Sequence, residues 1–285
     1  MGRKDVGTTT IYAFFRPTDT TNYSDSSVVS TTVTITNKAT GSSGSVSNPA
    51  AQTYKASGTY SYQLGISGAT GTVTYPTSIT VKNGSTTISG WTCTSAGVVT
   101  VPQGTNAASY TVTGSITVAA STNYKAVSAT SKTWTITINK ATGSASISGR
   151  TLTYSDGVAY DLISVSNNTG TMHYRLGTDG SWKDFKPATN VPGTYTVYYY
   201  MDASTNYTAR GSSSSPWGSV STTINKADPT YTAPTEKEGL MYNNTNLVLL
   251  NPGSSSHGTF YYRGGSSDSF STSIPTGNNS GTYVT

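Results

Sequence analysis

The sequence is short of the residue types on which most active sites depend. Charged residues fill only 10% of the 285 positions, and there are two histidines and one cysteine. The single cysteine, Cys93, excludes an internal disulfide; because it follows Trp91 in a strand-like run, we expect a buried structural thiol. The 17 basic side chains are scattered, so the net charge of +5 does not indicate a nucleic-acid-binding face. No apolar run approaches the roughly 20 residues that a membrane-spanning helix needs.

The few reactive side chains form no known catalytic or metal-binding pattern. His173 and His257 lie about one repeat apart, on strands predicted to be equivalent, and neither has a metal-ligating neighbour, so two strand-edge histidines are expected. No nucleophile elbow or phosphate-binding loop occurs. The sequence therefore predicts no catalytic residue, no metal and no cofactor. Five acidic residues are predicted to be separate loop or strand-end residues, none paired for glycoside hydrolysis: Asp156, Asp161, Asp179, Asp184 and Asp202.

What the sequence does have is a cassette that occurs three times, which outweighs chain length as a guide to domain number. Each copy starts with Thr-Asn-Tyr, continues through a β-branched run and closes with Asn-Lys-Ala. The cassette predicts the last strand of a domain followed by a linker. The copies start at Thr21-Asn22-Tyr23, Thr122-Asn123-Tyr124 and Thr205-Asn206-Tyr207, and close at Asn37-Lys38-Ala39, Asn139-Lys140-Ala141 and Asn225-Lys226-Ala227.

Apolar residues alternate with polar ones along these runs, as in strands with one buried face. In the second cassette Trp134, Ile136 and Ile138 are predicted to face inward, and the threonines between them outward. Asn83-Gly84 predicts a hairpin with a type I′ turn. Further strands are predicted at residues 10–15, 30–36, 59–64, 78–81, 92–101, 109–118, 195–201, 247–250 and 258–263. The inward-facing sets are predicted to be Tyr110, Val112, Ile116 and Val118, and Tyr195, Val197, Tyr199 and Met201.

Many short strands without a helical stretch predict an all-β chain of tandem immunoglobulin-like sandwiches. We divide it into the C-terminal half of a repeat (1–39), a long domain (40–141), a compact domain (142–227) and the N-terminal half of a repeat (228–285). Gly7-Thr8 starts a strand like that at Gly193-Thr194, and Gly281-Thr282-Tyr283 matches its beginning. The two half-domains are thus complementary parts of one repeat.

Three explanations of the half-domains are open. Residues 1–285 are a segment of a longer array, or neighbouring copies complete one another, or another partner caps each end. The segment is preferred, because an uncovered half-sandwich exposes sheet edges and an apolar face. Completion between copies would instead generate filaments.

The cassette lysine and the aromatic residues are the remaining candidates for function. The lysine of each Asn-Lys-Ala is expected to be a solvated linker residue, with a Lys–Asn cross-link as the covalent alternative. The aromatic residues are numerous enough that some are expected on the surface, where rings can stack on sugars. The preferred explanation is that tyrosine is simply a good strand residue with a polar tip. The candidate glycan or partner contacts are Trp182, Tyr198, Tyr200, Trp217, Tyr261 and Tyr262.

Residues 193–199 and the closing Thr223-Ile224-Asn225-Lys226-Ala227 resemble those of bacterial immunoglobulin-like repeats of the MBG type. The fourth unit is similar through residues 239–243 and 273–277, and residues 40–141 resemble a longer relative. The resemblance implies a spacer or adhesive stalk on a surface, with no catalytic residues. Similar domains occur on large bacterial surface proteins and on phage capsids and tails.

The sequence therefore predicts a non-enzymatic structural or adhesive protein in an extracellular setting. The start Met1-Gly2-Arg3-Lys4 has no apolar core behind it, unlike an export signal. If Met1 is native, this favours a phage virion fibre, decoration or tail component, because lysis releases virion proteins without export. The alternatives are the stalk of a bacterial surface protein and a carbohydrate-binding module of a secreted glycosidase. Expected partners are neighbouring repeats or copies, a capsid, tail or cell-wall anchor protein, and glycans.

Overall fold

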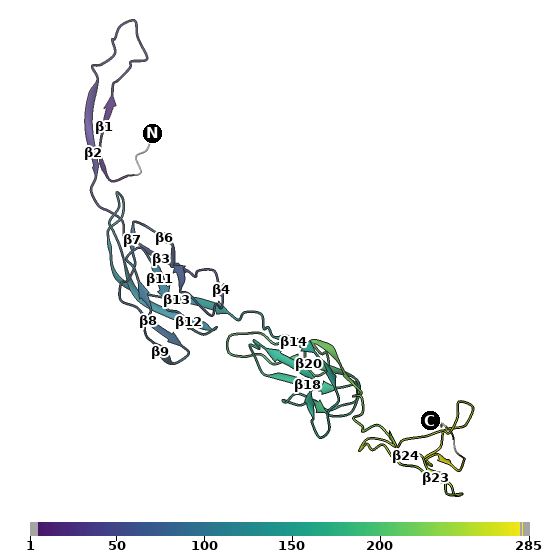
Figure 1. Cartoon of the computed structure of the whole chain (residues 1–285). Coiled ribbons are helices and arrows are strands. Elements are labelled where there is room, and N and C mark those ends of the chain that lie inside the picture. Colours follow the sequence, from purple (N-terminus) through teal and green to yellow (C-terminus); the bar gives the residue numbers. More distant parts are fainter. Residues whose placement is uncertain (1–4, 280, 282–285) are drawn as a thin grey trace.

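The computed structural model describes residues 5–279 and 281, and every regular element among them is a β-strand. Four units follow one another from the N-terminus to the C-terminus as an extended string (Figure 1). Two of them are complete sandwiches, each with its own core. The first and last units are partial, so the predicted all-β string with incomplete ends is confirmed.

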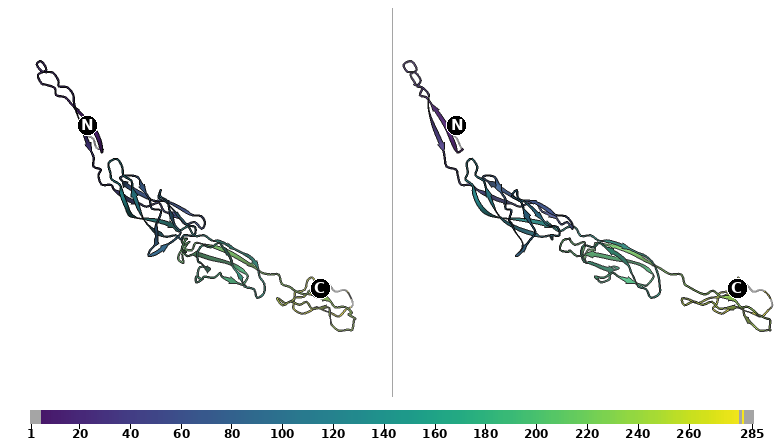
Figure 2. Two further views of the ribbon diagram at one scale, coloured as in Figure 1. Left: turned by 90° about the vertical axis from the view of Figure 1, so that its left-hand side faces the viewer. Right: turned by 60° about the vertical axis from the view of Figure 1, so that its left-hand side comes forward.

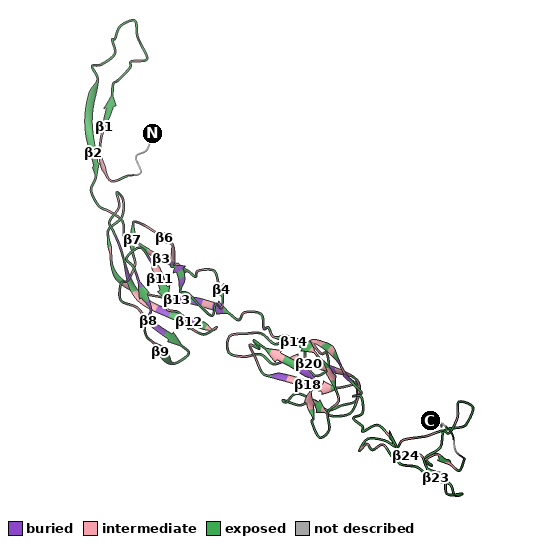
Figure 3. Cartoon of the chain, viewed as in Figure 1, coloured by how far each residue is buried: buried purple, intermediate pink, exposed green. Residues whose placement is uncertain are grey.

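The first unit is a single antiparallel hairpin. Strand β1 (Gly7–Ala13) pairs with β2 (Val29–Ile35) from Gly7 opposite Ile35 to Ala13 opposite Val29, close to the two predicted runs. None of its described residues is buried (Figure 3). The apolar side chains of one face lie open, with Ile11 51% exposed. Two strands have no second layer to pack against, so this face lacks cover.

The second unit is a sandwich of short strands around one core. A long sheet runs β4-β13-β12-β8-β9 with β7 beside β12, and faces a three-stranded sheet β10-β11-β5 and the pair β3-β6. The strands are β3 (Ser43–Ser47), β4 (Gln52–Thr53), β5 (Tyr60–Gln63), β6 (Gly65–Ala69), β7 (Val73–Thr74), β8 (Thr80–Asn83), β9 (Thr86–Ile88), β10 (Thr92–Cys93), β11 (Val98–Val101), β12 (Ser109–Val118) and β13 (Val127–Asn139).

The core of this unit confirms the predicted alternation. Trp134 and Ile136 are fully buried and Ile138 nearly so, and the indole of Trp134 donates to the Gly65 carbonyl at 2.9 Å. The predicted inward set of β12 is buried as well, since antiparallel pairing places it opposite the β13 residues. Cys93 is buried as expected, and burial raises the pKa of its thiol.

The predicted hairpin between β8 and β9 is present, but its turn is of another type. Asn83 pairs with Thr86, so Gly84 and Ser85 are the two central residues. Only Gly84 has a positive φ, at 58°. A type I′ turn needs positive φ at both central positions, whereas type II′ needs it only at the first. The type I′ prediction is therefore wrong, and the pattern fits type II′.

The third unit is a smaller sandwich of the same plan. Its main sheet runs β15-β21-β20-β18, with the pairs β14-β17 and β16-β19 across the core. The buried residues include Val197 and Met201 as predicted, while Tyr195 and Tyr199 pack partly buried against them. The strands are β14 (Ser146–Gly149), β15 (Thr151–Thr153), β16 (Tyr160–Asp161), β17 (Ile163–Ser166), β18 (Met172–Leu176), β19 (Ala188–Thr189), β20 (Gly193–Met201) and β21 (Gly218–Asn225).

Two details mark both sandwiches as immunoglobulin-like. In each, a short early strand pairs in parallel with the cassette strand, so that Thr53 lies opposite Asn139 and Thr153 opposite Asn225. In each, a tyrosine hydroxyl donates to the carbonyl four residues upstream, at 2.8 Å in both Tyr110 and Tyr195. This is the tyrosine corner of immunoglobulin-like folds.

In its described residues, 228–279 and 281, the fourth unit holds only short strands in two separate pairs. Strand β22 (Thr235–Glu236) pairs with β24 (Leu250–Asn251), and β23 (Leu247–Val248) with β25 (Thr276–Gly277). The strand predicted at residues 258–263 is wrong, since the structure has only a bridge between Tyr262 and Ser271 there. In the third unit the corresponding strand β18 is held by β20, and no such neighbour is present in the described part of the fourth unit.

Candidate functional sites: the interdomain clasp and the outer aromatic cluster

The two ends of the cassette meet across the junction between neighbouring units. At the first junction the linker residue Ala39 pairs in parallel with Tyr124 of the next unit. The Ala39 N–H donates to the Asn123 carbonyl at 2.8 Å, and the Ala39 carbonyl accepts from Lys125 N–H at 2.9 Å. The closing motif of one cassette is therefore hydrogen-bonded to the opening motif of the next.

The second junction repeats this arrangement. Ala141 pairs with Tyr207, its N–H donates to the Asn206 carbonyl at 2.9 Å and its carbonyl accepts from Thr208 N–H at 2.8 Å. The ring of Tyr207 also meets the edge of Tyr54 in the preceding unit, with centroids 5.5 Å apart.

The asparagine side chain of the opening motif reaches back to the preceding unit. Asn123 Oδ1 accepts from the Val6 N–H at 2.9 Å, and Asn206 Oδ1 accepts from the Ala107 N–H at 2.8 Å. The side-chain amide completes each contact, donating to Asp5 at the first junction and to Asn106 at the second. We call this set of backbone and asparagine contacts the interdomain clasp.

The tyrosine corner holds the segment to which the second clasp binds. Tyr110 Oη donates to the Asn106 carbonyl at 2.8 Å, and the Asn106 and Ala107 groups that receive Asn206 lie in the same turn. A buried tyrosine thus positions the backbone that the next unit recognises.

The cassette lysines were predicted to be solvated linker residues; Lys140 and Lys226 are exposed, whereas Lys38 is half-buried. Two of the three also make a specific contact. Lys38 Nζ donates to the Ser121 carbonyl and Lys140 Nζ to the Ser204 carbonyl, both at 2.8 Å. Each ammonium therefore fastens the linker to the loop of the following unit. The contact is to a main-chain oxygen, whereas a Lys–Asn cross-link would need a side-chain amide at that place.

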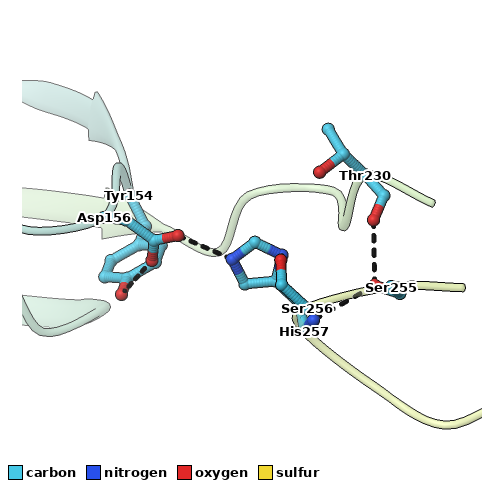
Figure 4. Close-up of polar contacts among 6 residues, drawn as sticks. All are labelled: Tyr154, Asp156, Thr230, Ser255, Ser256 and His257. Atoms are coloured by element: carbon cyan, nitrogen blue, oxygen red, sulfur yellow. Dashed lines mark hydrogen bonds and ion pairs between the residues drawn. The ribbon is translucent and has the colours of Figure 1, made fainter.

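The third junction is built differently (Figure 4). Pro192 occupies the position of Val6 and Ala107 and has no N–H to donate to an asparagine. Asp156 of the third unit instead contacts His257 of the fourth, with Oδ2 to Nε2 at 2.6 Å, and accepts from Tyr154 Oη at 2.8 Å. The hydrogen bonds from His257 and Tyr154 hold the pKa of Asp156 below its usual range.

Half of the candidate contact residues gather on the outer face of β18 and β20. The Arg175 guanidinium lies 4.8 Å from the Trp182 ring centroid and 5.3 Å from that of Tyr198. Tyr200 meets the Trp182 ring edge-on at 4.7 Å. We call this group the outer aromatic cluster. Its rings are half-buried, because they pack against the arginine and one another.

The cluster also contains a histidine between two acidic residues, which the sequence did not single out. His173 Nδ1 lies 2.8 Å from Asp184 and Nε2 lies 2.7 Å from Asp202, while its ring stacks on Tyr200 at 4.5 Å. The prediction that Asp184 and Asp202 are separate is wrong, because strand pairing brings their loops to the same histidine. His173 and His257 are also not equivalent: the residue that corresponds to His173 in the fourth unit is Tyr261.

The other candidate residues lie apart from this cluster. Trp217 packs against Tyr199 and carries the Arg210 guanidinium 4.8 Å from its ring centroid. In the fourth unit Tyr261 is 60% exposed, while Tyr262 is half-buried beside Phe260. The six residues thus form no single surface.

A metal-binding cluster and a membrane-spanning helix are both absent from the described residues. Within them, no group of three or more His, Cys, Asp or Glu side chains is arranged to hold a metal ion. No helix long and apolar enough to cross a membrane is found among them either.

No family model and no curated protein sequence matches the chain. Its structure is similar to Drosophila N-cadherin EC1-4, at 11% identity and a TM-score of 0.28, covering 72% of this chain and 53% of that one. The N-terminal part of the bacterial S-layer protein SbsC matches at 15% identity and 0.21, covering 64% and 44%. Fibronectin(III)-like modules of Clostridium thermocellum CbhA match at 13% and 0.20, covering 64% and 94%. None of these three TM-scores reaches 0.5, so the fold assignment rests on the strand pairing itself.

Proposed function

We propose that this chain is a non-enzymatic structural repeat protein whose clasped domains form a stiff spacer on an extracellular surface. The observation that carries the proposal is the clasp, which recurs with the same hydrogen bonds at two junctions. A chain that merely linked independent domains would need no specific contact between a linker and the loop of the next unit.

Each clasp restrains bending in more than one direction. The parallel bridge fixes the linker to the next unit, and the lysine ties the same linker to an adjacent carbonyl. The asparagine joins a residue just before the strand that pairs with the cassette strand of the preceding unit. A net hydrogen bond contributes about 0.5–1.5 kcal/mol, so several together restrain a junction without making it permanent.

The setting of the spacer follows from the resemblance to bacterial immunoglobulin-like repeats. We place it on a phage virion, as a head fibre, decoration or tail component; the alternative is the stalk of a bacterial surface protein. Mass spectrometry of the native N-terminus, together with the neighbouring genes, distinguishes the two. Capsid and tail genes would support the virion, and a signal peptide upstream with a wall anchor downstream would contradict it.

Small-angle X-ray scattering tests the stiffness. A compact chain of 285 residues would have a radius of gyration of about 19 Å, and a clasped string should lie well above this value. The double substitution Asn123→Ala and Asn206→Ala removes both side-chain contacts, so the distribution of interdomain distances should broaden while both cores stay folded.

The matched control is Asn22→Ala, with its scattering also measured in dilute solution. Asn22 is the same residue of the first cassette and bonds only within its own turn, to Asp19. Its replacement should leave the distance distribution unchanged. A double variant with the same distribution as the unmodified chain would contradict the proposed stiffening.

Glycan contact is a second candidate, favoured by the exposed ring of Tyr261. The cluster on the third unit is a weaker sugar platform, because Arg175 already occupies the space over Trp182 and Tyr198. If glycans bind, Tyr261→Ala should weaken binding to a glycan array, and Tyr198→Ala should do so less. No signal for the unmodified chain would retire this function.

A further inference from the structure

The fourth unit reproduces the strand pairing of the first half of the third unit. The offset between corresponding residues is 87 or 88 positions throughout, and the Leu162 N–H bond to the Pro187 carbonyl recurs as Leu249 N–H to Pro275. Three backbone pairs of the third unit have a counterpart in the fourth. Tyr160–Thr189 corresponds to Leu247–Gly277, Gly149–Ile163 to Glu236–Leu250, and Tyr174–Lys183 to Tyr262–Ser271.

What the fourth unit lacks, among the described residues, is any partner like β20 and β21. The core residues of the fourth unit are correspondingly less covered: Leu162 and Met172 are 0% and 5% exposed, whereas the corresponding Leu249 and Phe260 are only half-buried. An open cleft in this unit is lined by Leu240, Tyr242, Leu247 and Leu249, together with the glycines and asparagines at 277–279 and 281.

The hairpin of the first unit has the register of the missing pair. Gly7 lies opposite Ile35 in β1-β2, as Gly193 lies opposite Ile224 in β20-β21. Counted from Gly7, the positions that correspond to the buried Val197 and Met201 hold Ile11, within β1, and Phe15, two residues beyond its end; they are 51% and 68% exposed. The apolar face that would enter a core is thus present and uncovered.

We propose that the β1-β2 hairpin of one copy completes the fourth unit of a second copy. A single chain cannot do this by itself, because the hairpin and the fourth unit lie at opposite ends of the extended molecule (Figure 2). The added strand pairs with the edge at residues 260–264 as β20 pairs with β18. This register places Phe15 opposite Phe260, Ala13 opposite Tyr262 and Ile11 opposite Gly264.

The outer face of the joint is complementary as well. In the third unit Arg175 lies over Trp182 and also over Tyr198, which β20 supplies. In the fourth unit the corresponding Arg263 lies over Phe270 at 4.9 Å and lacks the second ring. The proposed register brings Tyr12, now 69% exposed, to the position of Tyr198. An arginine between two rings is a favourable cation–π arrangement.

The hairpin also carries the loop that the third junction lacks. Residues 21–23 are the Thr-Asn-Tyr of the first cassette, at the tip that points away from the second unit (Figure 1). In the joint they lie beside Lys226 and Ala227 as residues 205–207 lie beside Lys140 and Ala141. Because each copy has one hairpin and one acceptor at opposite ends, the contact does not close, and it builds a linear filament.

Light scattering of the chain over a range of concentrations tests the proposal. The mass should rise in multiples of one chain, with linear assemblies visible by electron microscopy. Phe15→Asp places a carboxylate in the joint and should raise the concentration needed for assembly at least about tenfold. Thr10→Asp, on the opposite face of β1, should change it little. A chain that stays monomeric at high concentration, or a Phe15→Asp variant that assembles normally, would overturn the proposal.

Mixing two variants distinguishes a chain that has lost one half of the joint from a chain that has lost its fold. Phe15→Asp keeps its acceptor and Phe260→Asp keeps its hairpin, so each alone should be monomeric and an equimolar mixture should stop at a dimer. Disulfide formation then checks the register. Phe14→Cys in one chain should cross-link to Tyr261→Cys in another, as Tyr200 pairs with His173, while Thr10→Cys should not. A mixture that remains monomeric, or preferential cross-linking of Thr10→Cys, would contradict the joint as proposed.

Discussion

At the scale of single residues, one asparagine organises each clasp. Its side chain offers an acceptor and two donors, which suits a turn that presents one free N–H beside one oxygen. Asn206 meets this demand with Ala107 and Asn106. The clasp can therefore be tested by a substitution that loosens this turn and leaves Asn206 in place.

Tyr110→Phe removes the hydroxyl that holds the Asn106 carbonyl. We expect a loss of about 0.5–1.5 kcal/mol from the second unit, because one hydrogen bond is lost with little change in packing. The amide of Ala107 should also exchange its hydrogen faster, since the clasp loses its support. Both effects can be followed by hydrogen exchange and denaturant unfolding.

Tyr195→Phe is the matched control for this prediction. It removes the same corner hydrogen bond in the third unit, to Val191, where no asparagine docks. We expect a similar loss of stability there and no change at the second junction. Equal exchange rates of the Ala107 amide in the two variants would show that the corner does not support the clasp.

At the scale of strands, the sequence predicted what a single strand displays by itself and missed contacts between segments far apart in the chain. Alternation alone identified Trp134 and Ile136 as core, because a strand with one buried face displays its own pattern. The clasp bond from Val6 to Asn123 spans 117 residues, so only the recurrence of Thr-Asn-Tyr hinted at it. Residues 258–263 have the composition of a strand, but a strand also needs a neighbouring strand to pair with. The periodicity of a segment does not show whether such a neighbour is present.

The third junction should respond to acid. The hydrogen bond from His257 lowers the pKa of Asp156, so the stabilisation that the ionised carboxylate gives the junction is fully present above the ordinary value of about 3.9 and is lost as the pH falls through the lowered value. In an NMR titration, His257→Ala should move the pKa of Asp156 back towards that ordinary value.

Asp19 provides an internal control for this titration. Its pKa is also lowered, but by hydrogen bonds from Asn22 in its own turn, far from the third junction. It should titrate identically in both proteins. An unchanged Asp156 in His257→Ala would mean that the two units do not meet at this residue in solution.

At the scale of the whole molecule, the two complete sandwiches share no core residue. The core of the second unit is built around Trp134, Ile116 and Val99, and that of the third around Met201, Leu162 and Val197. The clasp that joins them consists of polar contacts, and one ring contact, between Tyr54 and Tyr207, lies beside it. Hydrophobic burial is therefore confined within units, and stability should be too.

Calorimetry should accordingly resolve two unfolding transitions. Trp134→Ala empties a fully buried site and should destabilise the second unit by about 3–5 kcal/mol, lowering one transition and leaving the other in place. Met201→Ala should do the reverse, at about 2–5 kcal/mol. Thr135→Ala, on the exposed face beside Trp134, should move neither by more than about 0.5 kcal/mol. If Trp134→Ala lowered both transitions together, the clasp would be coupling the units as one cooperative body, which its few polar contacts do not predict.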